Sequence, residues 1–307
     1  MTSRWLFGLV LLATPALTQD PLAPLLTAAA RSPESFYGLV ARETLGMDKH
    51  LPPAQLPSPA RVEGQPNIQR ALRLREIGEY RLADEMIRHQ ARIGNPAEHL
   101  ALIAFAQKID FGGVQYWLAH NGPAGVTVPA AARYPLPNWT PDRGWRIESA
   151  LAFAHARQES DFRPGAVSPA GAVGLMQVRP GTAGDFARQR GVSLGDLTLP
   201  STNLEYGQSF IELMRSNPAT QGQLVKVMAA YNAGPVPVSR WNYINDRGDP
   251  LLWIESLPYW ETRYYVPTVL RNMWVYESLQ HGPTPTLTQM AQHRWPAFPA
   301  RSSTAAR

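Results

Sequence analysis

The spacing of apolar residues constrains the fold of this chain more than any other feature. In residues 67–120 apolar side chains recur about one helical turn apart, for example from Ile68 to Leu72 and from Leu82 to Met86, which is typical of amphipathic helices. Further helices are predicted as a pair within 20–50 and at 146–158, 181–190, 201–216, 221–232 and 261–280. No stretch alternates convincingly between apolar and polar residues, so the sequence predicts an all-α fold.

Proline-rich connectors divide the chain. The stretches 51–66 and 121–144 interrupt the helical pattern and predict loops, the second being the clearest domain boundary. We therefore expect a stack of helical hairpins in residues 20–135 and a second helical domain in residues 145–280. Residues 281–307 contain four prolines and are predicted to form a flexible C-terminal tail.

The first 19 residues have the pattern of a secretory signal peptide. Arg4 precedes an apolar stretch, and the small residues Ala16 and Thr18 follow it. The stretch is shorter than the roughly 20 residues of a transmembrane helix. An uncleaved anchor or a buried first helix remains the alternative. No cysteine follows the stretch, which excludes a lipid-modified N-terminus.

Composition excludes several kinds of site. The chain has no cysteine, which excludes disulfides, cysteine-bound zinc and thiol catalysis. Its formal charge of +5 favours anionic partners slightly, but no dense basic run supports a nucleic-acid partner. The seven histidines are scattered and no metal-binding motif is present. We therefore predict neither a metal nor another cofactor.

Glu159 is a lone carboxylate at the end of an alanine-rich apolar helix. The apolar face formed by Ile147, Leu151 and Ala154 reaches this residue when it is continued by one turn. Burial disfavours the ionised carboxylate and raises its pKa, which gives the protonated form that a general acid needs. A solvated helix-end glutamate or a structural ion pair is the alternative.

The residues after Glu159 predict a sharply bent loop. Pro164, Pro169, Gly171 and Gly174 favour turns and a close approach of the backbone. Gln177 adds an amide that can both donate to and accept from a sugar hydroxyl or N-acetyl group.

Four motifs carry a resemblance to a known family. QES (158–160), SPAGAVGLMQ (168–177), AAYNAGP (229–235) and ESLPYWETRYYV (255–266) occur in the order and spacing of the soluble lytic murein transglycosylases. The similarity covers residues 145–280 and implies a lysozyme-like catalytic domain. The preceding helices resemble, more weakly, the end of the superhelical region of longer family members.

The resemblance implies cleavage of the bond between N-acetylmuramic acid and N-acetylglucosamine in peptidoglycan. The reaction is not a hydrolysis, and it leaves a 1,6-anhydro-muramic end. Glu159 would first protonate the glycosidic oxygen and then take the proton of the muramoyl O6 hydroxyl, which closes on C1. Because the substrate carries its own nucleophile, no second carboxylate is needed.

The resemblance also implies a set of substrate-binding residues: Ser168, Met176, Gln177, Tyr231, Asn232, Glu261 and Tyr265. The Tyr231 hydroxyl is expected to orient Glu159, and Tyr265 is expected at the cleft. Four of these residues have an alternative role: Met176 in the core, Tyr231 in the core with its hydroxyl bonded, Asn232 in a turn, and Glu261 as a first-turn acid favoured by the helix dipole.

The remaining polar residues near the motifs are expected to be structural. Asp161 is predicted to lie at the surface or cap a loop, and Asp185 and Glu205 to occupy solvated helix positions. His155 is predicted to pack between helices, with contact to the site as the alternative. Arg179 departs from the family pattern, which has an apolar residue there. It could meet a substrate carboxylate or lie outside the cleft.

Other functions use the same residues. A lysozyme-type muramidase would replace the O6 hydroxyl with water, and a murein-binding protein would lack catalysis, which the presence of Glu159 disfavours. We expect a periplasmic monomer whose partner is the glycan strand of peptidoglycan. Other cell-wall or secretion-machine proteins are possible partners.

Overall fold

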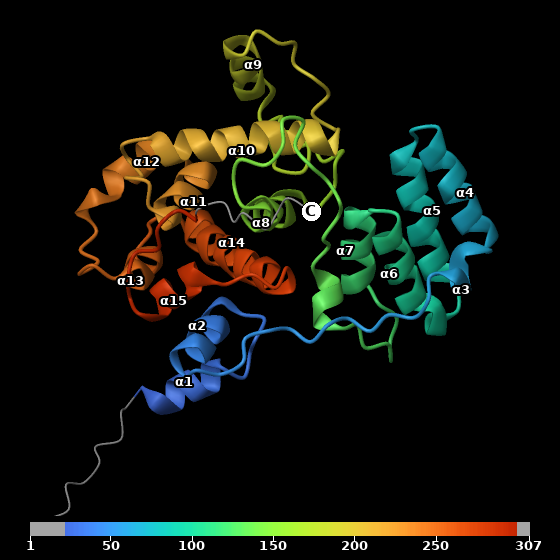
Figure 1. The fold of residues 1–307 in the computed structure, drawn as a ribbon, viewed down its shortest axis with the longest axis horizontal. Coiled ribbons are helices and arrows are strands. Elements are labelled where there is room, and N and C mark those ends of the chain that lie inside the picture. The colour runs from blue at the N-terminus through green and yellow to red at the C-terminus, as the bar shows by residue number, and fades with distance from the viewer. Residues whose placement is uncertain (1–21, 300–307) are drawn as a thin grey trace, which may run out of the picture.

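Helices account for the regular structure of the part of the chain that the computed structural model describes, residues 22–299 (Figure 1). Within this range there are isolated β-bridges but no strand. The predicted all-α class is therefore confirmed. The predicted signal peptide lies outside the described residues.

The N-terminal half contains seven α-helices. They are α1 (Ala23–Ala29), α2 (Phe36–Thr44), α3 (Ala60–Glu63), α4 (Pro66–Glu76), α5 (Tyr80–Ile93), α6 (His99–Lys108) and α7 (Gly112–His120). Short 3-10 helices η1 (Pro96–Glu98) and η2 (Ala130–Arg133) accompany them.

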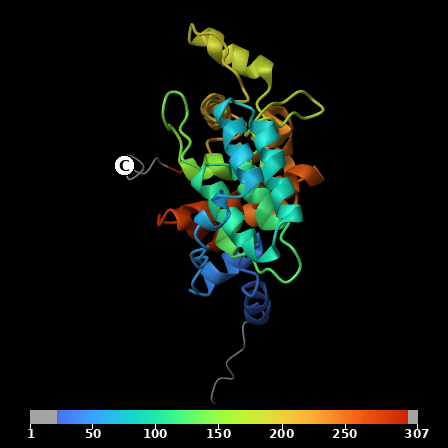
Figure 2. The ribbon, with the colours of Figure 1, turned by 90° about the vertical axis from the view of Figure 1, so that its right-hand side faces the viewer.

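Helices α4 to α7 form two antiparallel hairpins that stack side by side (Figures 1 and 2). Gly78, with φ of +83°, makes the turn between α4 and α5, a backbone conformation that glycine adopts without strain. The hairpins share a core of their own, in which Ile68, Ile87, Phe105 and Leu118 are fully buried. The apolar periodicity of the sequence corresponds to this core.

The C-terminal half contains eight α-helices and one 3-10 helix, η3 (Trp241–Tyr243). The α-helices are α8 (Ser149–Ser160), α9 (Pro180–Gln189), α10 (Pro200–Ser216), α11 (Leu224–Ala233), α12 (Pro235–Arg240), α13 (Pro250–Glu255), α14 (Trp260–Leu279) and α15 (Pro285–Ala291). Helix α8 lies along α14 in the centre of this half (Figure 1). Helix α9 projects from it, as Figure 2 also shows.

Helix α2 packs on the C-terminal half of the chain. The Phe36 ring stacks on Trp274 of α14 with ring centroids 5.3 Å apart, and α2 also contacts α15. Phe36, Leu39 and Val40 thus belong to the same buried cluster as α8 and α14. The domain limits expected from the sequence stay a prediction.

The predicted tail contains a packed helix. Leu287 and Met290 of α15 are fully buried, so residues 285–291 are not a loose extension. Pro285 occupies the first turn of α15, where proline is tolerated because its missing N–H has no helical partner anyway. A proline in this segment therefore begins a helix, although prolines there had been interpreted as signs of a loose tail.

The hairpin stack touches the C-terminal end of α8 directly. A Cβ added to Gly113 of α7 would lie 2.8 Å from the carbonyl oxygen of Phe162. The Arg157 guanidinium lies over the Tyr134 ring, 4.0 Å from its centroid. The segment that carries Glu159 is thus supported from the N-terminal half.

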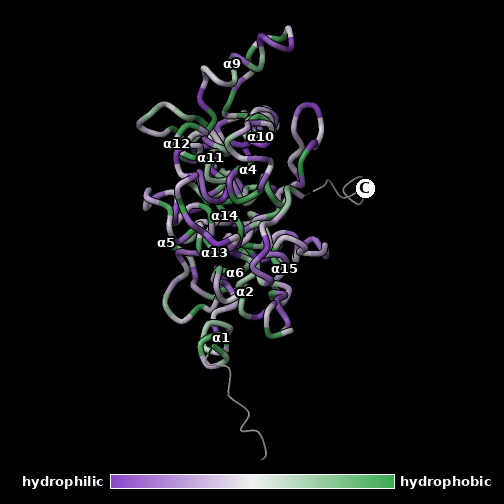
Figure 3. Tube along the Cα trace, turned by 90° about the vertical axis from the view of Figure 1, so that its left-hand side faces the viewer, coloured by the Kyte–Doolittle hydropathy of each residue, from purple (hydrophilic) through white to green (hydrophobic). Residues whose placement is uncertain are grey.

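The hydropathy of the helices varies residue by residue, as Figure 3 shows. None of the helices between residues 22 and 299 is long and apolar enough to cross a membrane.

Candidate active site

Glu159 lies in the last turn of α8, at the point where the helix ends. Asp161 and Phe162 both have left-handed backbone conformations, with φ of 53° and 60°, and they turn the chain away from the helix axis. Phe162 is fully buried, and this burial offsets the cost of its unusual conformation. The carboxylate also lies near the negative end of the helix dipole, which disfavours its ionised form.

The carboxyl group of Glu159 is largely enclosed by protein. Burial is the main cause that raises its pKa from 4.5 to about 7, and the nearby Glu261 carboxylate raises it further. The Tyr265 hydroxyl donates a hydrogen bond of 2.6 Å to Oε1, which lowers the pKa because it favours the ionised form. Near neutral pH both protonation states of Glu159 are therefore accessible.

His155 continues this hydrogen-bonded chain into the core. It lies one turn before Glu159 on α8, and its Nδ1 is 2.7 Å from the Tyr265 hydroxyl. The imidazole is fully buried, and this burial lowers its pKa to about 3. His155 is therefore neutral near neutral pH. It was expected to pack between helices, and it does so while also bonding the residue that holds Glu159.

The loop after Glu159 is fixed from two sides. The Ser160 hydroxyl donates to the Leu175 carbonyl oxygen over 2.8 Å. Asn203 on α10 accepts from the Met176 N–H and donates to the carbonyl oxygens of Val173 and Leu197, each over 2.8 Å. Asn203 is fully buried, and these three bonds satisfy its amide.

A pocket of about 320 Å³ opens at Glu159. It contains Glu159 and five of the predicted substrate-binding residues, namely Ser168, Gln177, Tyr231, Asn232 and Glu261. These residues come from α8, the loop after it, α11 and the first turn of α14. The fold thus brings together residues about 100 positions apart in the sequence.

Two predicted substrate-binding residues are not on the wall of this pocket. The Met176 side chain is fully buried and packs so closely on α10 that a Cβ at Gly207 would lie 2.2 Å from its sulfur. Tyr265 is also buried and binds Glu159 from within the protein. The structure corrects both predictions: Met176 belongs to the core and Tyr265 supports Glu159.

Tyr231 also differs from expectation. Its hydroxyl donates to the Met176 carbonyl oxygen over 2.7 Å, so it is not the donor that orients Glu159. Tyr231 nevertheless lines the pocket. The side chain fixes the loop against α11, and Tyr265 takes the role that the sequence had suggested for Tyr231.

Asn232 and Glu261 form a polar pair on the wall of the pocket. The Asn232 amide donates to Glu261 Oε1 over 3.1 Å and accepts from the Thr262 hydroxyl over 2.7 Å. Glu261 is the first-turn acid of α14, where the helix dipole stabilises its charge. It therefore places a second negative charge near Glu159.

Several residues of the pocket had not been predicted. Thr182 and Phe210 contribute to its wall, together with the small residues Ala170 and Ala172. Phe210 packs edge-on against Tyr231 with ring centroids 5.1 Å apart. Thr182 and Phe210 lie outside the four motifs, and the packing of α9 and α10 brings them to the site, whereas Ala170 and Ala172 lie within the motif at 168–177. Arg179, for which two roles were left open, also lines the pocket.

The other carboxylates near the motifs have structural roles. Asp161 is the C-terminal cap residue of α8, and Asp185 is exposed and paired with Arg188. The expectation for Glu205 was wrong, because it is buried and forms ion pairs with Arg146 and Arg190 over 2.7 and 2.9 Å. The helical pattern alone did not reveal these partners, since Arg146 lies 59 residues away in the sequence.

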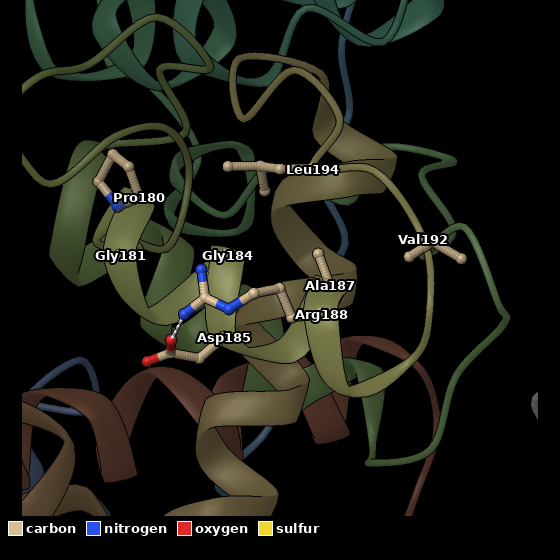
Figure 4. A pocket seen from close by; sticks show the side chains of 8 residues that line it. All are labelled: Pro180, Gly181, Gly184, Asp185, Ala187, Arg188, Val192 and Leu194. Atoms are coloured by element: carbon tan, nitrogen blue, oxygen red, sulfur yellow. Dashed lines mark hydrogen bonds and ion pairs between the residues drawn. The ribbon is translucent and has the colours of Figure 1, made fainter.

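A second, more open pocket of about 450 Å³ lies on α9 (Figure 4). Its walls include Pro180, Asp185, Arg188 and Leu194, and the figure shows the Arg188 side chain bonded to Asp185. Within residues 22–299, Asp185 and Arg188 are the only charged residues that line this second pocket, and Glu159 does not line it.

Residues 141–253 match the family described as the transglycosylase SLT domain. The soluble lytic murein transglycosylase of Escherichia coli K12 is 37% identical over 157 residues, which are 50% of this chain and 24% of that protein. A putative soluble lytic murein transglycosylase of Haemophilus influenzae is 34% identical over 146 residues, 46% of this chain and 24% of that protein. The chain therefore spans about a quarter of these relatives.

Solved structures resemble a larger part of the chain. The 70 kDa soluble lytic transglycosylase of Escherichia coli has a TM-score of 0.72 and 26% identity, covering 89% of this chain and 45% of that one. An inactive mutant of the lytic transglycosylase Slt from Pseudomonas aeruginosa has a TM-score of 0.67 and 27% identity, covering 87% and 45%. Residues 141–253 thus match a transglycosylase SLT domain, and the chain is similar in sequence and fold to soluble lytic murein transglycosylases.

Proposed function

We propose that the chain cleaves the glycan strand of peptidoglycan without water, with Glu159 acting first as general acid and then as general base. The observation that carries this proposal is the largely enclosed Glu159 carboxyl group, whose pKa is raised to about 7. A group that titrates near the working pH can both give and take a proton. The names of the relatives support peptidoglycan as the substrate.

In the first step, protonated Glu159 gives its proton to the glycosidic oxygen while the bond from C1 to that oxygen breaks. The leaving sugar departs as an alcohol, and positive charge develops at C1 and the ring oxygen. The Glu159 carboxylate that remains, with Glu261 nearby, stabilises this charge electrostatically.

In the second step, the muramoyl O6 hydroxyl attacks C1 and gives its proton to the Glu159 carboxylate. The new bond from O6 to C1 closes the 1,6-anhydro ring, and Glu159 is protonated again for the next turnover. Because nucleophile and electrophile belong to the same sugar, the reaction avoids the entropy cost of bringing in a water molecule.

A lysozyme-type muramidase is the second candidate. Glu261 favours it, because this residue is a second carboxylate in the same pocket, as glycosidases that use two carboxylates require. However, Asn232 already bonds Glu261 Oε1. The intramolecular route needs no water-activating group, so we favour it over hydrolysis.

The N-terminal sequence supports action outside the cytoplasm. A signal peptide in residues 1–19 would export the chain to the periplasm, where peptidoglycan is accessible. We expect the exported protein to act as a monomer on glycan strands, since one pocket holds all the groups that the two steps need.

Product mass is the decisive measurement. Purified peptidoglycan is digested with the wild type, with Glu159→Gln and with Asp185→Asn, which removes an exposed carboxylate outside the pocket. Muropeptides one water lighter than hydrolysis products are expected from the wild type and from Asp185→Asn but not from Glu159→Gln. Reducing ends would establish the muramidase instead, and binding without release of products would exclude both reactions.

A further inference from the structure

The hydrogen bonds behind Glu159 allow a further inference, which rests on the proposed function. We propose that His155 is a positioning residue that keeps the Tyr265 hydroxyl directed at Glu159 Oε1, so that Oε2 carries the catalytic proton. The chain of contacts runs from Nδ1 of His155 to the Tyr265 oxygen over 2.7 Å and from there to Oε1 over 2.6 Å.

The direction of these bonds follows from the number of available protons. An ionised carboxylate only accepts hydrogen bonds, so Tyr265 must donate its single hydroxyl proton to Glu159. The Tyr265 oxygen then faces His155 as an acceptor. A neutral imidazole has one protonated nitrogen, so His155 must carry its proton on Nδ1 and donate it to Tyr265.

The protonated form of Glu159 would also permit the reverse direction. The acid would then donate from Oε1 to Tyr265, Tyr265 would donate to Nδ1, and the imidazole proton would have to lie on Nε2. However, Nε2 of His155 is buried and has no hydrogen-bond partner within the described residues. An unpaired buried N–H group is rare in proteins because it loses its bond to water.

The Nδ1–H form therefore persists through both steps of the reaction. Oε1 then accepts from Tyr265 throughout, and the proton of the acid form is left to Oε2. No hydrogen bond to Oε2 is present within residues 22–299, while Glu159 itself lines the pocket. The acid proton therefore faces the substrate and not the protein.

Few other titratable or charged residues of the described range surround this chain of hydrogen bonds. Tyr231 on α11 packs on the imidazole with ring centroids 4.4 Å apart, and it stays neutral because burial raises its pKa. Glu261 on α14 is the other carboxylate that acts on Glu159, and Arg179 from the loop lines the same pocket. His155 is fully buried and uncharged near neutral pH, so its influence on Glu159 passes through the Tyr265 hydroxyl.

Two substitutions of similar size separate positioning from packing. His155→Asn can place an amide N–H where Nδ1 is, because both nitrogens are bonded to Cγ. His155→Leu fills similar space without a donor. In the leucine variant the Tyr265 hydroxyl loses its fixed direction and donates less strongly, so the Glu159 carboxylate is less stabilised and its pKa rises.

The kinetic test is the pH profile of kcat on purified glycan strands. The first step needs protonated Glu159, so activity falls as pH rises through its pKa. We expect His155→Leu to lower kcat about tenfold, to leave KM unchanged and to move the alkaline limb to higher pH. His155→Asn should return the limb toward the wild-type position. An unmoved limb in a folded His155→Leu variant would overturn the positioning role, even if kcat fell.

The second test does not depend on activity. In protein labelled with ¹⁵N-histidine, the chemical shifts of the ring nitrogens show which one carries the proton, and the His155→Asn variant assigns the signals. A proton on Nδ1 supports the proposal, whereas a proton on Nε2 or on both nitrogens overturns it. If the wild type released no anhydro products, the proposed function would fail, and the nitrogen shifts would still decide the hydrogen-bond direction.

Discussion

The hydroxyl of Tyr265, on the helix α14, lies 2.6 Å from Oε1 of Glu159, at the end of α8. The two residues are 106 positions apart, and the packing of α8 along α14 brings them together. This bond opposes the effect of burial on the carboxyl group. Burial raises the pKa of Glu159 and the Tyr265 hydroxyl lowers it, so their balance would set the pH range of the proposed activity.

Tyr265→Phe should therefore raise the pKa of Glu159 above about 7. The alkaline limb of the kcat profile moves to higher pH, because the acid form persists longer. At pH 7 we expect kcat to fall roughly 10- to 100-fold, since proton transfer in the first step must then form a less stable carboxylate. A pH series of initial rates checks this. A limb that stays in place or moves to lower pH would refute the assigned role.

Glu159 should also make the folded protein less stable as pH rises. Its folded pKa of about 7 exceeds the value of 4.5 for the free side chain, so the folded state binds more protons between these values. The stability is fully present below pH 4.5 and is lost as pH rises to about 7. Glu159→Gln should remove this loss. The free energy of unfolding of the variant, relative to that of the wild type, should therefore be higher at pH 8 than at pH 4.5 by roughly 1–3 kcal/mol. Urea unfolding at the two pH values measures it.

Glu277 provides a similar case away from the pocket. Burial, and then the nearby Glu148, raise its pKa to about 8, and its Oε2 is buried without a hydrogen-bond partner within the described residues. Glu277→Gln should be more stable than the wild type at pH 9, by roughly 1–3 kcal/mol, and should lose this advantage at pH 4.5. The kcat profile should not change. A shifted profile would mean that the two sites are coupled.

Gly174 is required by both conformation and space. Its φ is +80°, and an added Cβ would lie 2.2 Å from the Asn203 amide nitrogen and 2.4 Å from the Leu197 carbonyl oxygen. Gly174→Ala should break the bonds that hold the loop to α10 and cost roughly 3 kcal/mol or more. Gly171→Ala is the matched control, because Gly171 has φ of +76° with no atom within 4 Å of the added Cβ. It should cost about 1 kcal/mol, and equal costs in chemical denaturation would contradict this account.

The sequence predicted the features that depend on local patterns. The helix that carries Glu159 was predicted at 146–158 and is observed at Ser149–Ser160, because apolar periodicity reports the face that a helix buries. The predictions for Glu205 and for the segment that forms α15 were wrong, because a local sequence pattern does not report tertiary contacts. The ionic partners of Glu205 come from remote segments, and the proline that begins α15 is equally compatible with a loop.

The predicted positions of the site residues likewise agree with the structure where they depended on sequence motifs and differ from it where they depended on tertiary packing. Ser168, Gln177, Tyr231, Asn232 and Glu261 lie at the pocket of Glu159, and their role in binding substrate stays a prediction. The motifs did not reveal which tyrosine bonds the carboxyl group, because Tyr231 and Tyr265 both lie close to it. The choice depends on the direction of each hydroxyl in the packed core, which only the three-dimensional arrangement defines.

Arg179 offers a test of substrate recognition. It is exposed at the pocket, where the other charged residues are Glu159 and Glu261, and it has no ion pair within residues 22–299. A guanidinium here can bind a carboxylate of the muramoyl lactyl group or the stem peptide. Arg179→Met should raise KM about fivefold and leave kcat unchanged, because the contact forms equally in ground and transition states.

Ionic strength and a second arginine make this last prediction specific. The difference in KM between wild type and Arg179→Met should shrink at high salt, since an exposed ion pair is screened. Arg188→Met is the control, because Arg188 is paired with Asp185 on α9 and does not line the pocket of Glu159. It should leave KM unchanged. If both variants raised KM equally, the general positive charge of the protein and not a contact in the pocket would attract the anionic wall polymer.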